Sequence, residues 1–147
     1  MIFIYRHGEK ANASNCLSAT GILRGEHIGK IHARDECTFC TMAPVPPYQH
    51  IAPIQTASVA CTVACKTLNV LPNYTAIPRV HCGRIVVVVW YHREIGDALD
   101  FLRLEETGFR WPDDNHTGAI VVRDDNSWVF DPIFIHRPRY EQSSIRR

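Results

Sequence analysis

The chain opens with residue types suited to phosphoryl chemistry. Residues 2–5 are apolar and favour β-structure, and Arg6, His7 and Gly8 follow them directly. An arginine offers a planar fork of donors that fits phosphate oxygens, and a histidine offers a nitrogen nucleophile near neutral pH. Open α/β sheets bind ligands at the carboxyl ends of their strands. We therefore expect a site for a phosphoryl group where the first strand ends.

A second histidine follows another apolar run. Residues 85–90 are continuously apolar and mostly β-branched, which is typical of a strand covered on both faces of a parallel sheet. His92 comes two residues after this run, and a helix should follow it because apolar residues recur at helical spacing at Ile95, Ala98, Leu99 and Leu102. By itself, His92 is best explained as a structural histidine at a strand–helix junction. Its pairing with the first motif favours a ligand instead.

These segments resemble the histidine phosphatase (phosphoglycerate-mutase-like) superfamily. The family opens with a strand, an Arg-His-Gly signature and a helix entered through Leu-(Ser/Thr)-x-x-Gly, which residues 4–10, residues 17–21 and Arg24 match. His92 matches the second family histidine. Residues 111–114 resemble a Trp-Pro-x-Asp loop of one branch of the family, and residues 55–57 resemble its Arg-x-x-Gln-Thr element. The matches run from residue 2 to about residue 131 in the family's order.

The resemblance implies a fold and an activity. The fold would be a three-layer α/β/α arrangement with a mostly parallel central sheet over residues 1–136. Residues 137–147 are rich in arginine and lie at the end of the chain, so we expect a basic, mobile tail there. The activity would be hydrolysis of a phosphomonoester or a phosphohistidine through a phosphohistidine intermediate at His7. Arg6 and His92 would hold the phosphoryl oxygens, and neither a metal nor another cofactor would be needed.

The sequence departs from the family at a second phosphate-binding arginine. The family places it three residues before the Gln-Thr pair, where this chain has Ala52, and the nearest basic side chain is that of His50. Either His50 substitutes for the arginine or the site lacks one donor, which typically costs about 10²–10³ in rate. The alternative function is therefore a weakened or inactive pseudophosphatase that binds a phosphorylated ligand or a protein partner.

The proton donor is a second open point. Some family members have a carboxylate directly after the second histidine, but this chain has Arg93 there and Glu94 one residue later. A leaving alkoxide is best protonated by a carboxylic acid of raised pKa. Glu94 and Glu9 are the candidates, although either could simply be a solvated carboxylate in a first helical turn.

Composition fits a single enzyme-like domain. The 147 residues carry 16 Lys and Arg against 15 Asp and Glu, so no overall charge favours nucleic acid or an anionic membrane as partner. We expect a phosphorylated small molecule or a phosphoprotein as the partner, while the sequence specifies no oligomeric state. No basic leader or membrane-length apolar run is present, so a cytoplasmic location is expected.

The six cysteines permit a second interpretation. Cys37 and Cys40 have the C-x-x-C spacing of zinc and redox sites. Cys61 and Cys65 could complete a tetrahedral zinc site, but they have helical spacing. We therefore expect small buried hydrophobes at these two positions rather than metal ligands.

Strands and helices are predicted to alternate along the chain. The patterns predict strands over residues 2–5, 39–43, 85–90, 118–123 and 127–131, and helices over residues 20–34, 53–68 and 94–104. Such alternation with buried runs is typical of an α/β sheet with helices on both faces.

Overall fold

The fold is described from a computed structural model. The structure describes residues 1–9, 17–32, 37–41, 61–63, 85–90, 92–101 and 108–146. The strands are β1 (Ile2–Arg6), β2 (Cys37–Thr41), β3 (Cys61–Val63), β4 (Ile85–Trp90), β5 (Ala119–Val122) and β6 (Trp128–Asp131). The helices are α1 (Ala19–Ile31), α4 (Ile95–Phe101) and α5 (Arg139–Arg146), with short 3₁₀ turns η2 (His92–Glu94) and η3 (Phe134–His136).

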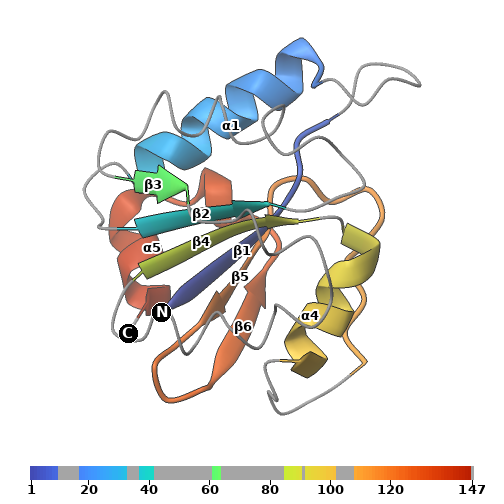
Figure 1. Ribbon diagram of the computed structural model, residues 1–147. Coiled ribbons are helices and arrows are strands. Elements are labelled where there is room, and N and C mark those ends of the chain that lie inside the picture. Colours follow the sequence, from blue (N-terminus) through green and yellow to red (C-terminus); the bar gives the residue numbers. More distant parts are fainter. Residues whose placement is uncertain are drawn as a thin grey trace.

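All six strands form one mixed sheet in the order β3-β2-β4-β1-β5-β6 (Figure 1). The pairs β3–β2, β2–β4 and β4–β1 are parallel, whereas β1–β5 and β5–β6 are antiparallel. The predicted α/β class is confirmed. The central pair matters most for function, because β1 and β4 run side by side from Ile2↔Val86 to Arg6↔Trp90.

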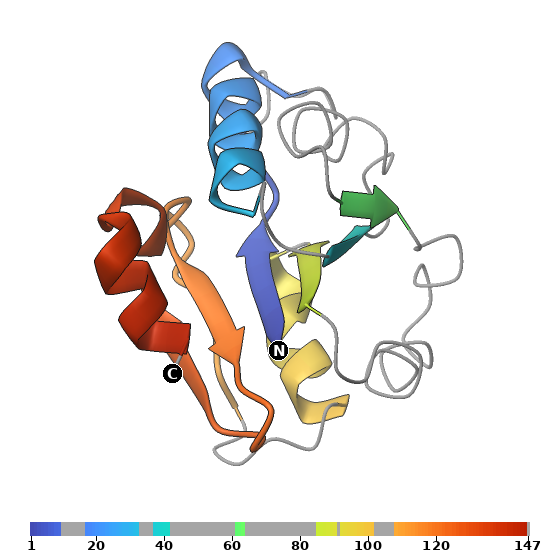
Figure 2. The ribbon, with the colours of Figure 1, turned by 90° about the vertical axis from the view of Figure 1, so that its left-hand side faces the viewer.

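Helices cover both faces of the sheet. Successive side chains of a strand point to opposite faces, so each central strand contributes buried residues to both. On one face, the buried members are Ile4, Val86, Val88, Ile120 and Val122 from the strands, Ile95 and Leu99 from α4, and Trp111. On the other face, they are Phe3, Tyr5, Val87, Val89, Ala119 and Val121 from the strands, Ile28 from α1, and Phe134 and Ile135 from η3. Figure 2 shows α1 and α5 on one side of β1 and α4 on the other.

The helix predicted over residues 53–68 is wrong at its centre. Residues 61–63 form strand β3, which lies parallel to β2 with Cys37 opposite Cys61. Thr62 and Val63 are β-branched, and β2 offers them an unpaired edge of backbone donors and acceptors. Backbone pairing with that edge stabilises a strand here, although the spacing of Cys61 and Cys65 is typical of a helix. The rest of the predicted helix lies outside the described residues.

The mobile tail predicted after residue 136 is also wrong. Residues Arg139–Arg146 form α5, which begins just after Pro138, where the backbone carbonyl accepts bonds from Glu141 and Gln142. Gln142 is buried and its Nε2 donates to the Phe134 carbonyl at 3.1 Å. Ile145, three residues further on, packs against the core cluster around Phe3. Gln142 and Ile145 are three residues apart and therefore lie on the same face of α5, and their contacts hold this face against the sheet.

No helix in the described ranges is long and apolar enough to cross a membrane.

Candidate active site

The two predicted site histidines leave the sheet at the same edge. His7 directly follows β1 and His92 opens the 3₁₀ turn after β4, and these two strands are parallel neighbours whose last pair is Arg6↔Trp90. The imidazole centroids of His7 and His92 lie 5.9 Å apart, with the ring planes inclined by 63°. The structure therefore brings together Arg6, His7 and His92, which are up to 86 positions apart in the sequence.

The ring of His7 is held in one orientation. It is 5 % exposed, and its Nδ1 lies 2.9 Å from the carbonyl oxygen of Gly8. A carbonyl can only accept, so Nδ1 donates and carries the proton in the neutral ring. Nε2 then bears the lone pair, which is the form required of a nitrogen nucleophile.

The glycines after β1 let the chain return tightly to α1. A side chain at Gly21 would collide with the backbone carbonyl of Glu9, and one at Gly8 would lie 2.9 Å from the Gly21 carbonyl. Ser18 caps α1 by accepting from the Gly21 amide at 3.1 Å, and its own amide donates to the Glu9 carbonyl at 2.8 Å. The Arg-His-Gly and Leu-Ser-x-x-Gly motifs are thus two halves of one packed connection.

Arg6 is oriented by the Trp-Pro loop. Its Nη1 donates to the backbone carbonyls of Asp113 and Asn115, the latter at 3.4 Å. The loop is fixed in turn, because Trp111 Nε1 donates to the Asn115 carbonyl at 2.8 Å. The Asn115 side chain also accepts from the amide of Gly118 at 2.8 Å. Arg6 is therefore positioned by a segment more than 100 residues away in sequence.

His92 is kept neutral by its surroundings. Burial and the positive charge of Arg6 lower the pKa of His92 to about 4, against an opposing effect of Asp113. The Asp113 carboxylate lies 3.6 Å from His92 Nε2 and is itself 92 % exposed. At pH 7 this contact therefore joins a carboxylate to a neutral imidazole, and His92 can donate or accept a hydrogen bond but supplies no charge.

A third histidine at the site was missed in the sequence. His116 is half-buried and adjoins His7, whose backbone acts to raise the pKa of its ring. Burial and the charge of Arg6 lower the pKa of His116, while Glu9 opposes them. His116 follows the Trp-Pro loop, and its position after that loop is the only sequence signal that could have pointed to it.

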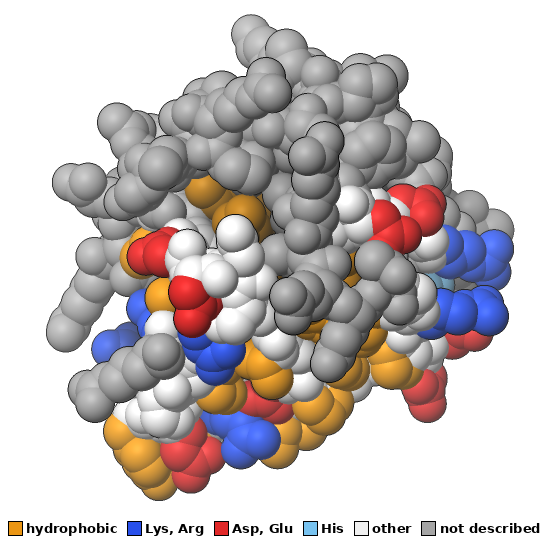
Figure 3. Space-filling model, turned by 90° about the horizontal axis from the view of Figure 1, so that it is seen from below, with side chains coloured by type: hydrophobic (Ala, Val, Ile, Leu, Met, Phe, Trp, Pro, Cys, Tyr) orange, Lys and Arg blue, Asp and Glu red, His pale blue; other side chains and the backbone are white. Residues whose placement is uncertain are grey.

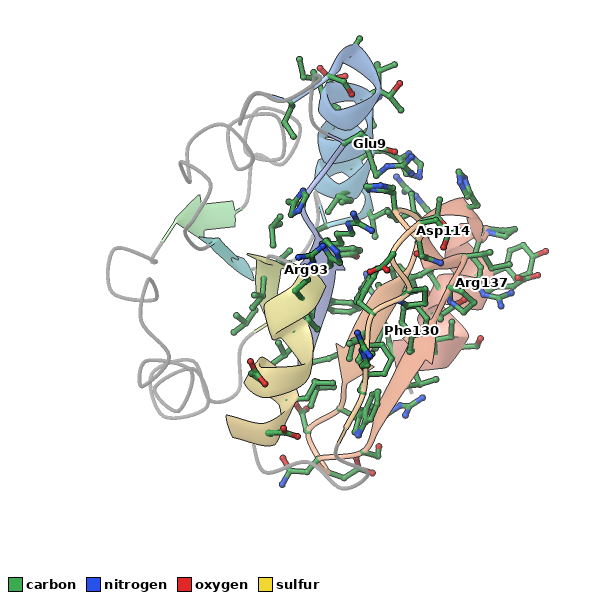
Figure 4. All side chains as sticks on the ribbon, turned by 90° about the vertical axis from the view of Figure 1, so that its right-hand side faces the viewer. Glu9, Arg93, Asp114, Phe130 and Arg137 are labelled. Atoms are coloured by element: carbon green, nitrogen blue, oxygen red, sulfur yellow. The ribbon has the colours of Figure 1, made fainter. Side chains whose placement is uncertain are left out.

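Glu9 lacks the raised pKa expected of a proton donor. Its carboxylate receives a bidentate contact from Arg24, whose Nε lies 3.0 Å from both oxygens. Burial alone would raise the pKa of Glu9, but hydrogen bonds and the charge of Arg24 outweigh burial and lower it. Figure 4 shows Glu9 beside α1. Glu94 ends the turn η2, but its side chain, like His50 and Ala52 as a whole, lies outside the described residues.

A cavity of about 290 Å³ opens beside His92. It is lined by His92, Arg93, Gly96, Phe109, Arg110, Trp111 and Asp113. Arg93, labelled in Figure 4, comes from the turn η2, and the other wall comes from the segment that leads into the Trp-Pro loop. Within the described ranges, no group of three or more His, Cys, Asp or Glu side chains is arranged to hold a metal ion.

Three solved structures have a similar fold. A protein assigned as the phosphohistidine phosphatase SixA from Agrobacterium tumefaciens aligns with 14 % identity and a TM-score of 0.53, covering 81 % of this chain and 88 % of that one. The protein histidine phosphatase SixA complexed with tungstate gives 13 % identity and a TM-score of 0.53, covering 88 % and 93 %.

The third is a protein assigned as an alpha-ribazole-5'-P phosphatase from Escherichia coli, with 13 % identity, a TM-score of 0.57 and coverage of 88 % and 93 %. No protein-family model matches the chain, and no curated protein matches its sequence. At such low identity these similarities establish the shared fold.

Proposed function

We propose that this chain, which has the fold of the histidine phosphatase superfamily as its motifs predicted, is a phosphohydrolase acting on a phosphomonoester or a phosphohistidine. The observation that carries the proposal is the state of His7. Its ring is buried, its Nδ1 is committed to the Gly8 carbonyl, and it lies next to Arg6 and 5.9 Å from His92.

In the proposed first step, His7 Nε2 attacks phosphorus and the bond from phosphorus to the leaving group breaks. The Nδ1–H bond to the Gly8 carbonyl stabilises the positive charge that develops on the ring as the nitrogen–phosphorus bond forms. In the second step, water attacks phosphorus, the nitrogen–phosphorus bond breaks, and inorganic phosphate leaves with neutral His7 restored.

Arg6 and His92 would hold the phosphoryl oxygens in both steps. Two partners of Arg6 are backbone carbonyls, so the guanidinium is placed before substrate arrives and little reorganisation is needed. His92, neutral at pH 7, would donate one hydrogen bond. His50 is our candidate for the missing second cation. The SixA neighbour complexed with tungstate, a tetrahedral oxyanion, supports an anion site on this fold.

The leaving group must take up a proton unless it is already a weak base. Glu94 remains our candidate donor because it lies two residues after His92 in the turn η2. Asp113 is the alternative, since its carboxylate is the one placed beside His92 in the described part of the chain. The scheme needs no cofactor, and it fits a phosphorylated small molecule or a phosphoprotein as substrate in the cytoplasm.

Hydrolysis of an aryl phosphate by the natural chain and by His7→Ala tests the proposal. We expect turnover that His7→Ala abolishes and that the exposed control His136→Ala leaves unchanged. A quenched reaction should also contain phosphate bound to the protein that is stable in alkali and labile in acid, as a phosphohistidine is. Turnover that survives in His7→Ala would overturn the scheme. Phosphate binding without any turnover would identify a pseudophosphatase, the alternative that Ala52 favours.

A further inference from the structure

We propose that the cavity beside His92 is a subsite for a negatively charged leaving group. Preferred substrates would then carry a second anionic group, a carboxylate or another phosphate, on the part of the molecule that departs. This inference rests on the proposed phosphohydrolase function, because His92 is both a wall of the cavity and a neighbour of His7. A group in the cavity would therefore lie next to the phosphoryl site.

The size of the cavity restricts the occupant. A volume of about 290 Å³ lies just below the range of roughly 300–1,000 Å³ usual for small-molecule pockets. The two walls are held close together, since a side chain at Gly96 of α4 would collide with the Phe109 carbonyl. Phe109 and Trp111 give one wall an aromatic surface, with ring centroids 6.3 Å apart. Such a space fits a small, flat leaving group.

The charge of the lining determines the class of occupant. Arg93 and Arg110 are both exposed at the cavity, and neither makes an ion pair or a side-chain hydrogen bond in the described part of the chain. One carboxylate, Asp113, opposes them, and it lies against His92. With His92 neutral at pH 7, the lining carries two positive charges and one negative charge. Figure 3, a view from below, shows Lys and Arg side chains gathered at one edge of the molecule.

Arginine at a concave site favours planar anions. A guanidinium presents parallel donors that match a carboxylate or phosphate in a bidentate contact. An unpaired surface arginine is by itself only a solvated charge. Here two of them line one cavity that also contains a reaction-site histidine, so an anion bound there would be aligned with the scissile bond.

The test compares two substrates that differ by one charge, 4-carboxyphenyl phosphate and its neutral analogue 4-carbamoylphenyl phosphate. The measured quantity is the ratio of their kcat/KM values, from which effects common to both substrates cancel. We expect Arg93→Gln and Arg110→Gln each to lower the natural chain's ratio by roughly threefold to tenfold, which corresponds to the net contribution of one typical hydrogen bond. Asp113→Asn should raise it, because a repulsive charge is removed.

Arg139→Gln is the matched control, because Arg139 is also exposed but lies in α5, on the opposite face of the sheet from α4. It should leave the ratio unchanged. Added salt should reduce the kcat/KM ratio of the natural chain. It should not reduce the ratio of a double variant that carries both Arg93→Gln and Arg110→Gln. Thermal melting of each variant establishes that it is folded. A ratio that neither arginine variant alters, with both substrates turned over, would overturn the subsite while leaving the phosphohydrolase function intact.

If the natural chain hydrolyses neither substrate, the proposed function fails separately from the subsite. Binding of the corresponding phosphonates, 4-carboxyphenyl and 4-carbamoylphenyl, is then measured by chemical-shift titration. Tighter binding of the carboxylate that is lost in Arg93→Gln and Arg110→Gln would still support the subsite. Equal binding of the two phosphonates would overturn it.

Discussion

Arg6 illustrates how single residues of this site are prepared for an anion. The backbone carbonyls of Asp113 and Asn115 orient its guanidinium without neutralising its charge. The same charge contributes to the low pKa of both His92 and His116. A dianionic phosphate arriving at this point would meet one fixed cation and histidines that act as neutral hydrogen-bonding groups.

Replacing Arg6 with lysine should lower kcat/KM for an aryl phosphate by about 10²–10³. Lysine keeps the charge but lacks the planar fork, so it cannot hold the carbonyls of the Trp-Pro loop and a phosphate oxygen in the same geometry. Steady-state kinetics at saturating and limiting substrate measure the effect, with Arg139→Lys as the control. Activity of Arg6→Lys within a factor of two of the natural chain would contradict this role.

The lowered pKa of His92 leads to a separate prediction, which concerns the pH dependence of stability. In the unfolded chain His92 binds a proton near pH 6.5, but in the folded chain only near pH 4. Between these values the unfolded chain binds more protons, so acidification favours unfolding and the contribution of His92 is lost as the pH falls from about 6.5 to 4. Above pH 6.5 both states are neutral at this position and no effect is expected.

Urea unfolding at a series of pH values measures this effect. The free energy of unfolding should decline less steeply between pH 6.5 and 4 in His92→Gln than in the natural chain. His116, whose pKa is also lowered, should contribute a further part of the slope in the same direction. The exposed His136→Gln is the control. Identical slopes for His92→Gln and the natural chain would show that His92 is not held neutral by the fold.

The sequence predicted the members of the site that belong to local motifs, and no others. Arg6 ends strand β1, and His7 and His92 come just after strands β1 and β4, which could be recognised from their apolar runs. Asp113 lies in the Trp-Pro motif that the sequence indicated, but its place beside Arg6, and that of His116 beside His7, depend on packing across more than 100 positions, which no local pattern encodes. The lowered pKa of Glu9 likewise depends on Arg24, one turn into α1, and only the packed connection brings the two together.

At the scale of elements, the connection between β1 and α1 determines where His7 lies. Gly21 lies in the first turn of α1 against the backbone of Glu9, and Glu9 is two residues after His7. The amide and hydroxyl of Ser18 both donate to the Glu9 carbonyl, at 2.8 and 3.1 Å. Any change that pushes α1 away from this backbone should therefore move the nucleophile.

Gly21→Ala should lower both stability and activity. Alanine improves intrinsic helix propensity by about 1 kcal/mol, but the collision with the Glu9 carbonyl forces backbone shifts that typically cost about 1–3 kcal/mol. The collision should prevail because its partner is backbone. Thr20→Ala, at the neighbouring exposed position of α1, gains up to about 0.7 kcal/mol in propensity without a collision and should be neutral or stabilising. Urea unfolding and aryl phosphate turnover measure the two effects, and a stabilised Gly21→Ala would contradict the close approach.

The sequence predicted an element correctly where burial of its side chains determines the secondary structure. It failed where pairing with another strand determines it. The run of residues 85–90 coincides with β4, since β-branched residues covered on both faces have few alternatives to a strand. Residues 61–63 carry a weaker pattern, and their state depends on the exposed edge of β2. That edge belongs to another part of the chain, so local spacing predicted a helix instead.

For the whole molecule, the arrangement of the sheet depends on how the last strands are connected. Five residues separate β5 from β6, and a connection this short returns the chain as an antiparallel neighbour. Asn126, with φ of 66°, provides the left-handed residue of the turn. The sequence indicated both strands and their short spacing, but not that β5 would lie antiparallel beside β1, which β4 flanks on its other side.

The closing helix α5 gives the last prediction. Gln142 is 4 % exposed and donates to the Phe134 carbonyl, and Arg146 lies 4.9 Å above the ring of Phe3. Gln142→Ala would remove one of the two donors to that carbonyl, which keeps the Arg137 amide, at a cost of about 0.5–1.5 kcal/mol in the free energy of unfolding. Ser143→Ala, at the next and exposed position, should change it by less than about 0.5 kcal/mol. Urea unfolding distinguishes a mobile tail from a helix packed on the sheet. In a mobile tail neither substitution would change the free energy of unfolding, whereas in a packed helix only Gln142→Ala is destabilising.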